Sequence, residues 1–378
     1  MLPNLSNPFV SAEHRFPYET LLERDPIVLD QRNIRNQIRN SKILITGAAG
    51  SIGTQLALQI CDYQPQLLIL LDQSETALGD VEMHIRSAYP TINVNAFIAN
   101  ITDPVRIDSI LRQFRPDIVF HAAAYKHVPI MEKHPYEAIR TNVLGTQILA
   151  DLAIKYRVSK FIFISTDKAV NPSSVMGASK RLAEMYIQQT LHSGTQFIIT
   201  RFGNVLGSNG SFISVFQKQI ASGGPVTVTH PDASRYLMTI PEACQLVLEA
   251  SAIGTGGQVL YFDMGKPVLI RTIAEKMIRS LNLRPNKVIE IIFTGLRPGE
   301  KLSEELHQPD ELECFSIHPK IKLMNAACPA NADFEAFNKS LAAVLSSSCS
   351  DEMVSFLKRM VPEYVSCNSD FERLDLVT

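Results

Sequence analysis

From Lys42 onward, short apolar runs alternate with stretches whose apolar positions recur at helical spacing. The runs read KILIT, QLLILL, VNAFIA, DIVFH, KFIFIS and QFIIT. Continuous apolar runs separated by amphipathic stretches are typical of βαβ units, because a parallel strand covered by helices is buried on both faces. The pattern therefore predicts an α/β fold built on a doubly wound parallel sheet.

After Arg201 this alternation loosens into a Gly-rich sequence that contains proline, with one further strand expected at QVLYFD. Two amphipathic helices are expected in FEAFNKSLAAVLSSS and DEMVSFLKRMV. This order favours a smaller, interleaved substrate-binding lobe. The predicted organisation is an N-terminal arm over 1–40, a sheet domain over 41–203 with a returning segment about 239–266, and a lobe with C-terminal helices over 204–238 and 267–378. We expect the arm to pack on the body of the protein or on a neighbouring subunit.

Composition limits the class of protein. With 46% apolar residues in 378 positions the chain can bury a large core, and a net charge of −2 gives no broad basic surface for nucleic acid. Six cysteines without CxxC spacing argue against a zinc site or a disulfide framework, so we expect no metal and a reducing compartment. No apolar run reaches the length of about 18 residues that a membrane-spanning helix needs, and the first residues are too polar for a signal peptide. These features predict a soluble cytoplasmic protein.

The sequence ILITGAAGSIG places Gly47, Gly50 and Gly53 between a predicted strand and a predicted helix. The first glycine permits a tight turn, the second lets the backbone approach a pyrophosphate, and the third allows close packing of the helix on the strand. Asp72 ends the next strand, where its carboxylate can accept hydrogen bonds from both ribose hydroxyls and repel a 2′-phosphate. The arrangement predicts a Rossmann dinucleotide site that prefers NAD to NADP.

The run FIFI is followed by STDKAVNPSSVMGASK, in which Asp167 and Lys168 come shortly after a predicted strand. The carboxyl ends of the strands are where doubly wound sheets place their chemistry. Met176 and Lys180 lie one turn apart on the helix expected next. The stretch is therefore the candidate catalytic segment.

Six motifs occur in order along the chain, namely TGAAGSIG, FHAAAYKHVPIMEKHP, TNVLGT, ISTDKAVNPSSVMGASK, RFGNVLGSNGS and GLRPGEKLSEEL. With them the chain resembles the extended short-chain dehydrogenases, and more closely the CapD-type polysaccharide-biosynthesis enzymes, which are nucleotide-sugar 4,6-dehydratases acting on UDP-N-acetylglucosamine. The resemblance covers about residues 20–330 and favours the members without transmembrane helices. Met176 stands where the superfamily normally has a tyrosine, and in this it resembles the subgroup with methionine at that position.

The resemblance implies that C4 of the sugar is oxidised by NAD⁺, that water is lost across C5 and C6, and that the hydride returns to C6. It implies that Asp167 protonates the leaving C6 hydroxyl and that Lys168 is the base at C5, which requires a raised pKa for Asp167 and a lowered pKa for Lys168. Lys180 is expected to bind the nicotinamide ribose. Because Met176 cannot exchange a proton, Thr166 and a water held near Lys180 remain as substitutes for the base at the C4 hydroxyl.

Further residues are expected to contact the cofactor or the sugar nucleotide. The expected cofactor contacts are Gly47, Gly50, Ser51, Ile52, Gly53, Asp72, Asn100, Ile101, Ala122, Ala123 and Lys180. The expected substrate contacts are Lys126, Asn142, Asn204, Arg235, Arg297 and Glu300. Asn100 stands where relatives often carry an aspartate that meets the adenine amino group, and an amide oxygen can accept the same hydrogen bond.

The two arginines and the glutamate of the substrate set resemble a clamp for the diphosphate and the uridine ribose. An arginine fork suits a diphosphate, and the carboxylate of Glu300 suits a ribose diol. His121 and His127 are expected to be structural, since single histidines without a paired carboxylate are weak signals of function.

The leading hypothesis is a retaining UDP-N-acetylglucosamine 4,6-dehydratase of bacterial glycan biosynthesis. A C5-inverting 4,6-dehydratase and a nucleotide-sugar 4-epimerase are the enzymatic alternatives, and a non-catalytic NAD-binding regulatory or scaffold protein is the alternative of another class. The helices expected in PYEAIRTNVLGTQILADLAIKY and MGASKRLAEMYIQQTLH carry more apolar positions than one core face needs. This surplus predicts a homodimer or a higher assembly built from dimers.

Overall fold

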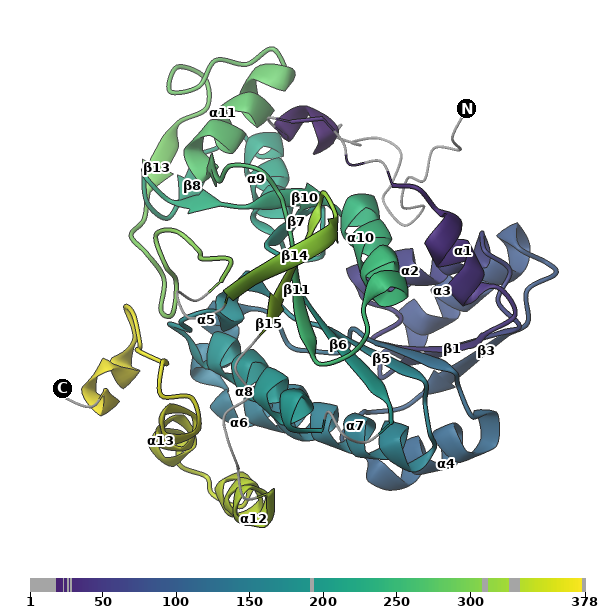
Figure 1. Ribbon diagram of the computed structural model, residues 1–378. Coiled ribbons are helices and arrows are strands. Elements are labelled where there is room, and N and C mark those ends of the chain that lie inside the picture. The colour runs from purple at the N-terminus through teal and green to yellow at the C-terminus, as the bar shows by residue number, and fades with distance from the viewer. Residues whose placement is uncertain are drawn as a thin grey trace.

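The computed structural model describes residues 18–375 except residues 23, 26, 28, 191–193, 308–311 and 326–333. Its centre is a 9-stranded sheet with the order β14-β15-β11-β6-β5-β4-β1-β2-β3 (Figure 1). The strands are β1 (Lys42–Thr46), β2 (Leu67–Asp72), β3 (Val94–Ile98), β4 (Ile118–His121), β5 (Lys160–Ile164), β6 (Gln196–Arg201), β11 (Gln258–Phe262), β14 (Leu312–His318) and β15 (Ile321–Asn325). All pairings from β11 to β3 are parallel, which confirms the predicted fold class.

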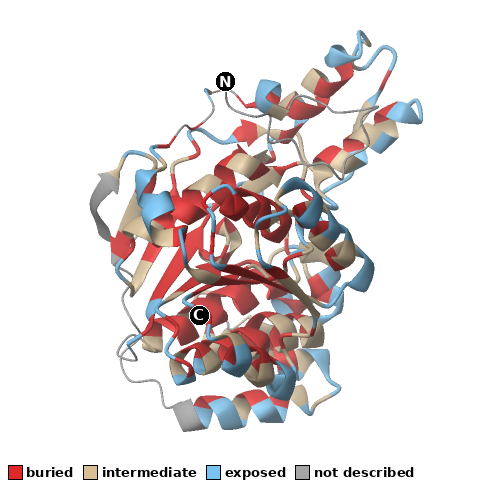
Figure 2. Ribbon diagram, turned by 90° about the vertical axis from the view of Figure 1, so that its right-hand side faces the viewer, coloured by how far each residue is buried: buried red, intermediate tan, exposed pale blue. Residues whose placement is uncertain are grey.

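Helices cover both faces of this sheet, and the buried residues follow the sheet and the helix sides that face it (Figure 2). One face is covered by α1 (Arg32–Ile38), α2 (Ser51–Cys61), α3 (Glu75–Ala88) and α10 (Ile240–Ile253). The other face is covered by α4 (Pro104–Phe114), α7 (Gly145–Lys155) and α8 (Val175–Gln189). Ile43 and Ile45 of β1 lie in the buried cluster on the face of α2 and α10, and Leu44 lies in the buried cluster on the face of α7 and α8. Successive side chains of a strand point to opposite faces, which is why the strands read as continuous apolar runs.

The chain between β4 and α7 forms short helical segments rather than one regular helix. They are α5 (Val128–Lys133), α6 (Pro135–Ala138) and η3 (Ile139–Leu144), and η3 is a π-helical turn that runs directly into α7. Asn142 lies in this turn and is fully buried. Single π-helical turns within helices are frequent at functional sites, because they redirect side chains.

A smaller lobe has a buried cluster of its own and lies in the upper part of Figure 1. Its helices and strands are β7 (Asn204–Leu206), α9 (Phe212–Ala221), β8 (Val226–Val228), β9 (Ser234–Arg235), β10 (Leu237–Thr239), β12 (Val268–Leu269), α11 (Ile270–Ser280) and β13 (Ile291–Phe293). The strands pair two by two, β7 with β10, β9 with β12 and β8 with β13. Strand β11 and helix α10 lie between lobe segments in the sequence but pack in and on the large sheet. The hairpin β14–β15 also joins that sheet, although it falls in the segment 267–378 that was expected to belong to the lobe.

The described part of the N-terminal arm connects the lobe to the sheet domain of its own chain. Leu21, at the end of η2 (Tyr18–Leu21), is fully buried in the cluster of the lobe, and Ile34 of α1 is fully buried in a cluster of the sheet domain. Between them, Arg24 forms an ion pair with Glu242 at 2.8 Å and donates a hydrogen bond to the carbonyl of Met264 at 3.0 Å. The arm therefore packs on the body, which is one of the two placements expected for it.

The C-terminal helices pack on the sheet domain beside α8. They are α12 (Phe334–Leu345) and α13 (Ser350–Met360), followed by η5 (Asp370–Leu374). The ring of Phe337 lies 5.7 Å from that of Tyr186, and Arg181 forms an ion pair with Glu363 at 2.7 Å. Part of the apolar surplus that predicted a dimer through α8 is therefore covered by the same chain, and the assembly stays a prediction. Within the described residues, no helix is long and apolar enough to cross a membrane.

Candidate active site

The glycine-rich turn between β1 and α2 lies in close contact with the segment that follows β4. Gly47 has a φ of +68°, and a Cβ added to it would lie 2.6 Å from the backbone nitrogen of Ala123. A Cβ added to Gly53 would lie 2.1 Å from the carbonyl oxygen of Gly47. Only glycine fits both positions, because backbone atoms rather than flexible side chains occupy the space. The turn thus presents backbone N–H groups and the N-terminus of α2, which is a cradle that fits a dinucleotide pyrophosphate.

Asp72 lies at the end of β2 beside this cradle. Its Oδ2 accepts a hydrogen bond from the N–H of Ala49 at 3.0 Å, and its Oδ1 accepts one from the N–H of Ser74 at 2.9 Å. These bonds fix the carboxylate and leave one lone pair on each oxygen for the two hydroxyls of a ribose. The residues therefore fit NAD as the prediction required.

Asn100 and Ile101 lie just beyond β3. The Oδ1 of Asn100 accepts hydrogen bonds from the N–H and the hydroxyl of Thr102, at 2.9 and 2.8 Å, and its Nδ2 donates to Gln73 at 3.1 Å. Both lone pairs of that oxygen are therefore engaged in the turn. The hydrogen bond that we expected it to accept from the adenine amino group has to displace one of these contacts.

A loop of the lobe reaches the cofactor cradle. The N–H of Asn209 donates a hydrogen bond to the Oγ of Ser51, the first residue of α2, at 3.0 Å. A Cβ added to Gly210, which has a φ of +68°, would lie 2.6 Å from the ring of His127. The loop is thus held between α2 and the segment after β4, so the lobe and the dinucleotide site are in direct contact.

The catalytic segment leaves β5 and forms a short 3-10 turn, η4 (Asp167–Ala169), before α8 begins. Asp167 is fully buried, and its Oδ1 accepts hydrogen bonds from the hydroxyl of Thr166 and from the Nζ of Lys168, both at 2.9 Å. Its Oδ2 is also buried and has no hydrogen-bond partner among the described residues. A buried carboxyl oxygen without a partner is costly unless a ligand or a proton satisfies it.

Lys168 has a pKa above its ordinary value. Burial, the largest single influence, lowers this pKa, but the charges of Asp167 and Glu304 and the hydrogen bond to Asp167 outweigh it, while Arg235 opposes them. The Nζ of Lys168 donates to the Oδ1 of Asn204 at 3.1 Å and lies 3.5 Å from the Oε1 of Glu304. Our expectation of a lowered pKa for Lys168 is wrong for this arrangement, because two carboxylates stabilise the ammonium.

Lys180 and Met176 lie on the first turns of α8. The Nζ of Lys180 donates to the carbonyl of Ile164 at 2.7 Å and lies 3.8 Å from the centre of the Phe163 ring. Burial lowers the pKa of Lys180 to about 7, although the charge of Glu184 acts in the opposite direction. Met176 is buried in the core cluster beneath the sheet. It therefore packs, while Lys180 can exchange a proton near neutral pH.

Two buried hydrogen-bond networks, around Glu184 and around Asn142, hold the catalytic segment in place. Glu184 accepts hydrogen bonds from the hydroxyl of Ser165 at 2.5 Å and from Arg201 at 2.7 and 2.9 Å, and these partners keep the pKa of Glu184 low against the effect of burial. The side chain of Asn142 bonds to the backbone N–H and carbonyl of Tyr125 at 2.9 and 3.0 Å and donates to the Oγ of Ser179 at 2.9 Å. The strand end, the segment after β4 and α8 are thereby fixed relative to one another.

His121 is fully buried at the end of β4. Its ring nitrogens lie 2.8 Å from the hydroxyl of Thr46 and 2.9 Å from that of Thr146. Burial, helped by the charge of Lys180, lowers its pKa, so the imidazole is neutral. This geometry agrees with the structural role expected for it.

The expected substrate contacts differ in exposure and in how many of their hydrogen-bond donors are already engaged within the protein. Arg235 is buried, and its guanidinium donates to Glu300 at 3.1 Å and to the carbonyls of Ser234, Lys301 and Leu302 at 2.7 to 3.0 Å. It therefore organises the loop after β13 rather than offering free donors. Among the expected substrate contacts, Arg297 and Lys126 have exposed side chains and can reach a bound anion without breaking buried contacts.

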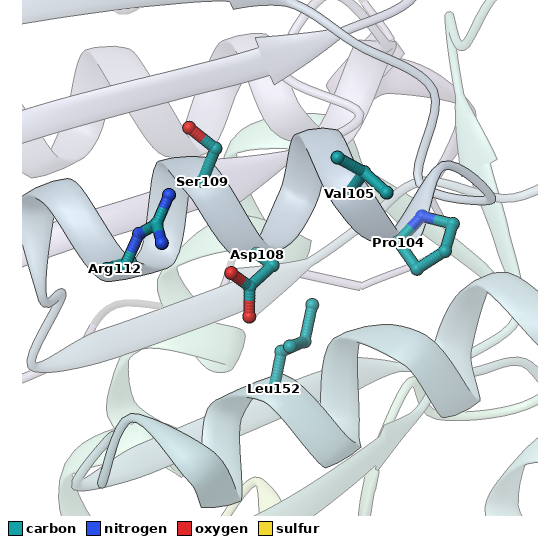
Figure 3. Close-up of a pocket in the computed structure, with 6 residues that line it drawn as sticks. All are labelled: Pro104, Val105, Asp108, Ser109, Arg112 and Leu152. Carbon is teal, nitrogen blue, oxygen red and sulfur yellow. The ribbon is translucent and has the colours of Figure 1, made fainter.

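The structure brings most of the predicted residues together at the carboxyl ends of β1, β2, β4 and β5. It also adds Glu304, which the sequence did not single out although it lies in the GLRPGEKLSEEL motif. A separate pocket between α4 and α7 is shown in Figure 3. Its lining residues are Pro104, Val105, Asp108, Ser109, Arg112 and Leu152. None of the predicted site residues lines it.

Comparison with known proteins places the chain in a family. A family model described as "Polysaccharide biosynthesis protein" matches residues 43–326. Capsular polysaccharide biosynthesis protein CapD of Staphylococcus aureus is 49% identical over 306 residues, which are 80% of this chain and 51% of that protein. The chain therefore belongs to this polysaccharide-biosynthesis family, within the extended short-chain dehydrogenases, as its motifs predicted. It spans about half the length of CapD.

Other relatives bear on the chemistry and the fold. The UDP-N-acetylglucosamine 4,6-dehydratase (inverting) of Campylobacter jejuni is 34% identical over 298 residues, covering 75% of this chain and 84% of that protein. The solved structure of a double mutant of DesIV, a dTDP-glucose 4,6-dehydratase from Streptomyces venezuelae with NAD bound, superposes with a TM-score of 0.63 at 22% identity. The match covers 70% of this chain and 88% of that chain. The first likeness is one of sequence to an enzyme of that name, and the second shows that this chain and DesIV share a fold.

The cradle predicts a strong effect of a single methyl group. Gly53→Ala would place its Cβ 2.1 Å from the carbonyl of Gly47, so we expect the purified variant to carry at least about tenfold less bound dinucleotide than the wild type, measured by chromatography of the released cofactor. Gly79→Ala in α3 is the matched control, because its Cβ meets no atom within 4 Å. This control should keep the dinucleotide and unfold at an equal or higher temperature. Wild-type dinucleotide content in Gly53→Ala would contradict the assigned cradle.

The pKa of Lys180 predicts a pH dependence of stability. Between its folded pKa of about 7 and its higher unfolded pKa, the unfolded state binds more protons, so the free energy of unfolding rises with pH in this window. We expect dinucleotide-free protein to gain up to about 1.4 kcal/mol per pH unit from this residue between pH 7 and pH 9. Urea unfolding of the wild type and of Lys180→Met measures this slope. The variant should lack the gain, and equal slopes in both proteins would refute the lowered pKa.

Proposed function

We propose that this chain is an NAD-dependent dehydratase that converts UDP-N-acetylglucosamine to UDP-4-keto-6-deoxy-N-acetylglucosamine with retention at C5. The observation that carries the proposal is the contact between the fully buried Asp167 and the partly buried Lys168, in which the Oδ2 of Asp167 has no partner among the described residues. A 4-epimerase needs a proton acceptor only at the C4 hydroxyl. Loss of water across C5 and C6 additionally needs an acid and a base, and this pair supplies both.

The cofactor is NAD, held by the glycine-rich turn, by Asp72 and by Lys180. Bound NAD supplies the oxidant for C4 and the reductant for C6, so no second substrate is required. Asp72 favours NAD over NADP, because the carboxylate at the end of β2 would repel a 2′-phosphate. The lobe, which contacts the cradle through Asn209 and Ser51, carries the nucleotide end of the substrate.

The hydrogen bond within the pair supports this chemistry without a proton from outside. Lys168 donates to Asp167 along a 2.9 Å hydrogen bond, so transfer of one proton converts the ion pair into a neutral carboxylic acid and a neutral amine. The neutral amine then takes the C5 proton, and the acid protonates the leaving C6 oxygen. Lys168 later returns its proton to C5 from the same face, which gives retention.

The proton of the C4 hydroxyl needs a separate acceptor, because the thioether of Met176 cannot accept a proton. Thr166, which donates to Asp167 at 2.9 Å, and a water near Lys180 are the two routes. The pKa of Lys180, about 7, supports Lys180 as the group that finally takes this proton at neutral pH.

The second candidate is a C5-inverting 4,6-dehydratase, favoured by the 34% identity to the Campylobacter jejuni enzyme of that name. Retention is preferred because Met176 replaces the superfamily tyrosine, and the inverting relatives usually keep that tyrosine. Both candidates form a 4-keto-6-deoxy sugar and differ only in the face at which C5 is reprotonated.

The test is incubation of the purified chain with UDP-N-acetylglucosamine and NAD in deuterated water. We expect a product lighter than the substrate by one water before isotope is counted, with deuterium at C5 and the gluco configuration there by NMR. Inversion at C5 would select the second candidate. A product of unchanged mass, altered only at C4, would identify an epimerase, and no reaction with any UDP or GDP sugar would favour the non-catalytic alternative.

Substitutions in the pair separate its two roles from packing. Asp167→Asn and Lys168→Met should each lower turnover by about 10² to 10⁴, the usual range for a positioned acid or base. Met176→Leu should keep most of the turnover, because it preserves the volume and apolarity of a buried residue. Turnover is measured by mass spectrometry of the product, with the melting temperature as a check on folding. Full activity in either substitution of the pair, or an inactive but folded Met176→Leu, would overturn the assignment.

A further inference from the structure

Glu304 is a buried carboxylate for which the chemistry above gives no reason. Its side chain is 4% exposed, and its Oε1 lies 3.5 Å from the Nζ of Lys168 and 3.9 Å from the Nε of Arg235. Burying a carboxylate costs free energy unless a partner compensates for the lost water. Its position beside the proposed C5 base therefore indicates a role in the reaction.

The groups that face the amine of Lys168 come from four segments. Asp167 of η4 and Asn204 of β7 accept its hydrogen bonds, Arg235 of β9 adds a repulsive positive charge, and Glu304 adds the second negative charge. Asp167 gives up its charge when it takes the proton of Lys168. Glu304 is then the carboxylate that remains charged beside the amine.

The guanidinium of Arg235 does not neutralise Glu304 by a short contact. Its two terminal nitrogens are engaged by Glu300 and by the carbonyls of Ser234, Lys301 and Leu302, and only its Nε faces Glu304, at 3.9 Å. The shorter of the two ion pairs of Glu304 is therefore the one with Lys168. At 3.5 Å in a largely buried site, the attraction between the carboxylate of Glu304 and the amine of Lys168 is strong enough to change the proton affinity of the amine.

We propose that Glu304 is a positioning residue for the C5 proton transfer, which holds the amine of Lys168 in place and stabilises the ammonium that forms there. The inference rests on the proposed dehydration. In that step the C5–H bond breaks and its electrons form the C5–C6 double bond. The C6–O bond breaks, Asp167 protonates the departing oxygen, and Lys168 becomes positively charged. A carboxylate already fixed at that point stabilises the new charge without reorganisation.

Glu304→Gln tests this proposal because the amide keeps the shape of the side chain and removes its charge. Glu305→Gln is the matched control. It changes the neighbouring residue in the same way, but Glu305 is 50% exposed and its partners are Lys301, at 3.7 Å, and Asn171. Glu304→Asp restores the charge with a shorter side chain, so it should behave between the wild type and Glu304→Gln. Melting temperatures establish that each variant is folded.

The first measurement does not depend on activity. Trace acetylation with acetic anhydride reports the neutral fraction of each amine, and mass spectrometry compares Lys168 with the exposed Lys266 in the same sample. Removing the charge of Glu304 should lower the pKa of Lys168 by about one unit, so its labelling rate between pH 7 and pH 9 should rise about tenfold relative to Lys266. Glu305→Gln should label like the wild type. An unchanged rate in folded Glu304→Gln would overturn the proposal.

The second measurement follows water loss in a single turnover with UDP-N-acetylglucosamine and determines kcat and KM in the steady state. A weaker base that is less well held should slow water loss at least about tenfold in Glu304→Gln, with KM changed by less than about threefold. A raised KM with unchanged kcat would assign Glu304 to substrate binding and overturn the proposal. If labelling changes as expected but no protein in the series dehydrates the sugar, the proposed function fails while the assignment of Glu304 to the charge of Lys168 stands.

Discussion

The buried contact between Asp167 and Lys168 is the constraint on which the active-site architecture depends. These residues are neighbours in the chain, and a 3-10 turn rather than a strand lets their side chains meet. A carboxylate with no exposure requires compensation, which comes from Thr166 and Lys168. The ammonium of Lys168 in turn requires acceptors, and these are Asn204 and Glu304 from outside the catalytic segment.

This chain of requirements explains why the lobe and the sheet domain are interleaved. Asn204 begins the first lobe strand, and Glu304 follows the loop that Arg235 organises. The lobe therefore completes the surroundings of a residue that the sheet domain presents. The arm residue Arg24 contacts both parts, because it pairs with Glu242 of α10 and donates to the carbonyl of Leu237 in β10 at 3.4 Å. In the proposed dehydration, this arrangement would couple the placement of the nucleotide to that of the acid and the base.

Met176 and Lys180 show how the site differs from a tyrosine-dependent dehydrogenase. Met176 is buried, and burial lowers the pKa of Lys180 to about 7 although the charge of Glu184 acts in the opposite direction. Lys168 has the opposite shift, because carboxylates lie within 3.5 Å of it. Two lysines of one candidate catalytic segment thus have pKa values shifted in opposite directions, which is how environment separates acid and base functions.

The sequence by itself determined the parallel sheet, the dinucleotide turn and the catalytic segment, because their signals are local. Apolar runs specify buried strands, Gly47 and Gly53 specify a backbone contact that excludes a Cβ, and STDK follows directly on a strand. Only the tertiary structure decided the partners of Lys168. Glu304 lies far from it in the sequence, so the raised pKa, where a lowered one was expected, could not be derived from spacing.

The same distinction holds for Arg235 and for the C-terminal helices. An arginine in a motif reads as a phosphate ligand, yet its guanidinium is engaged by carbonyls and a carboxylate of a loop that follows β13. The apolar surplus of α8 reads as a subunit interface, yet Tyr186 contacts Phe337 of the same chain. Sequence patterns show that a side chain will be buried or charged. The long-range packing of the chain decides which partner that side chain packs against or pairs with, since contact energies depend on neighbours that no local pattern encodes.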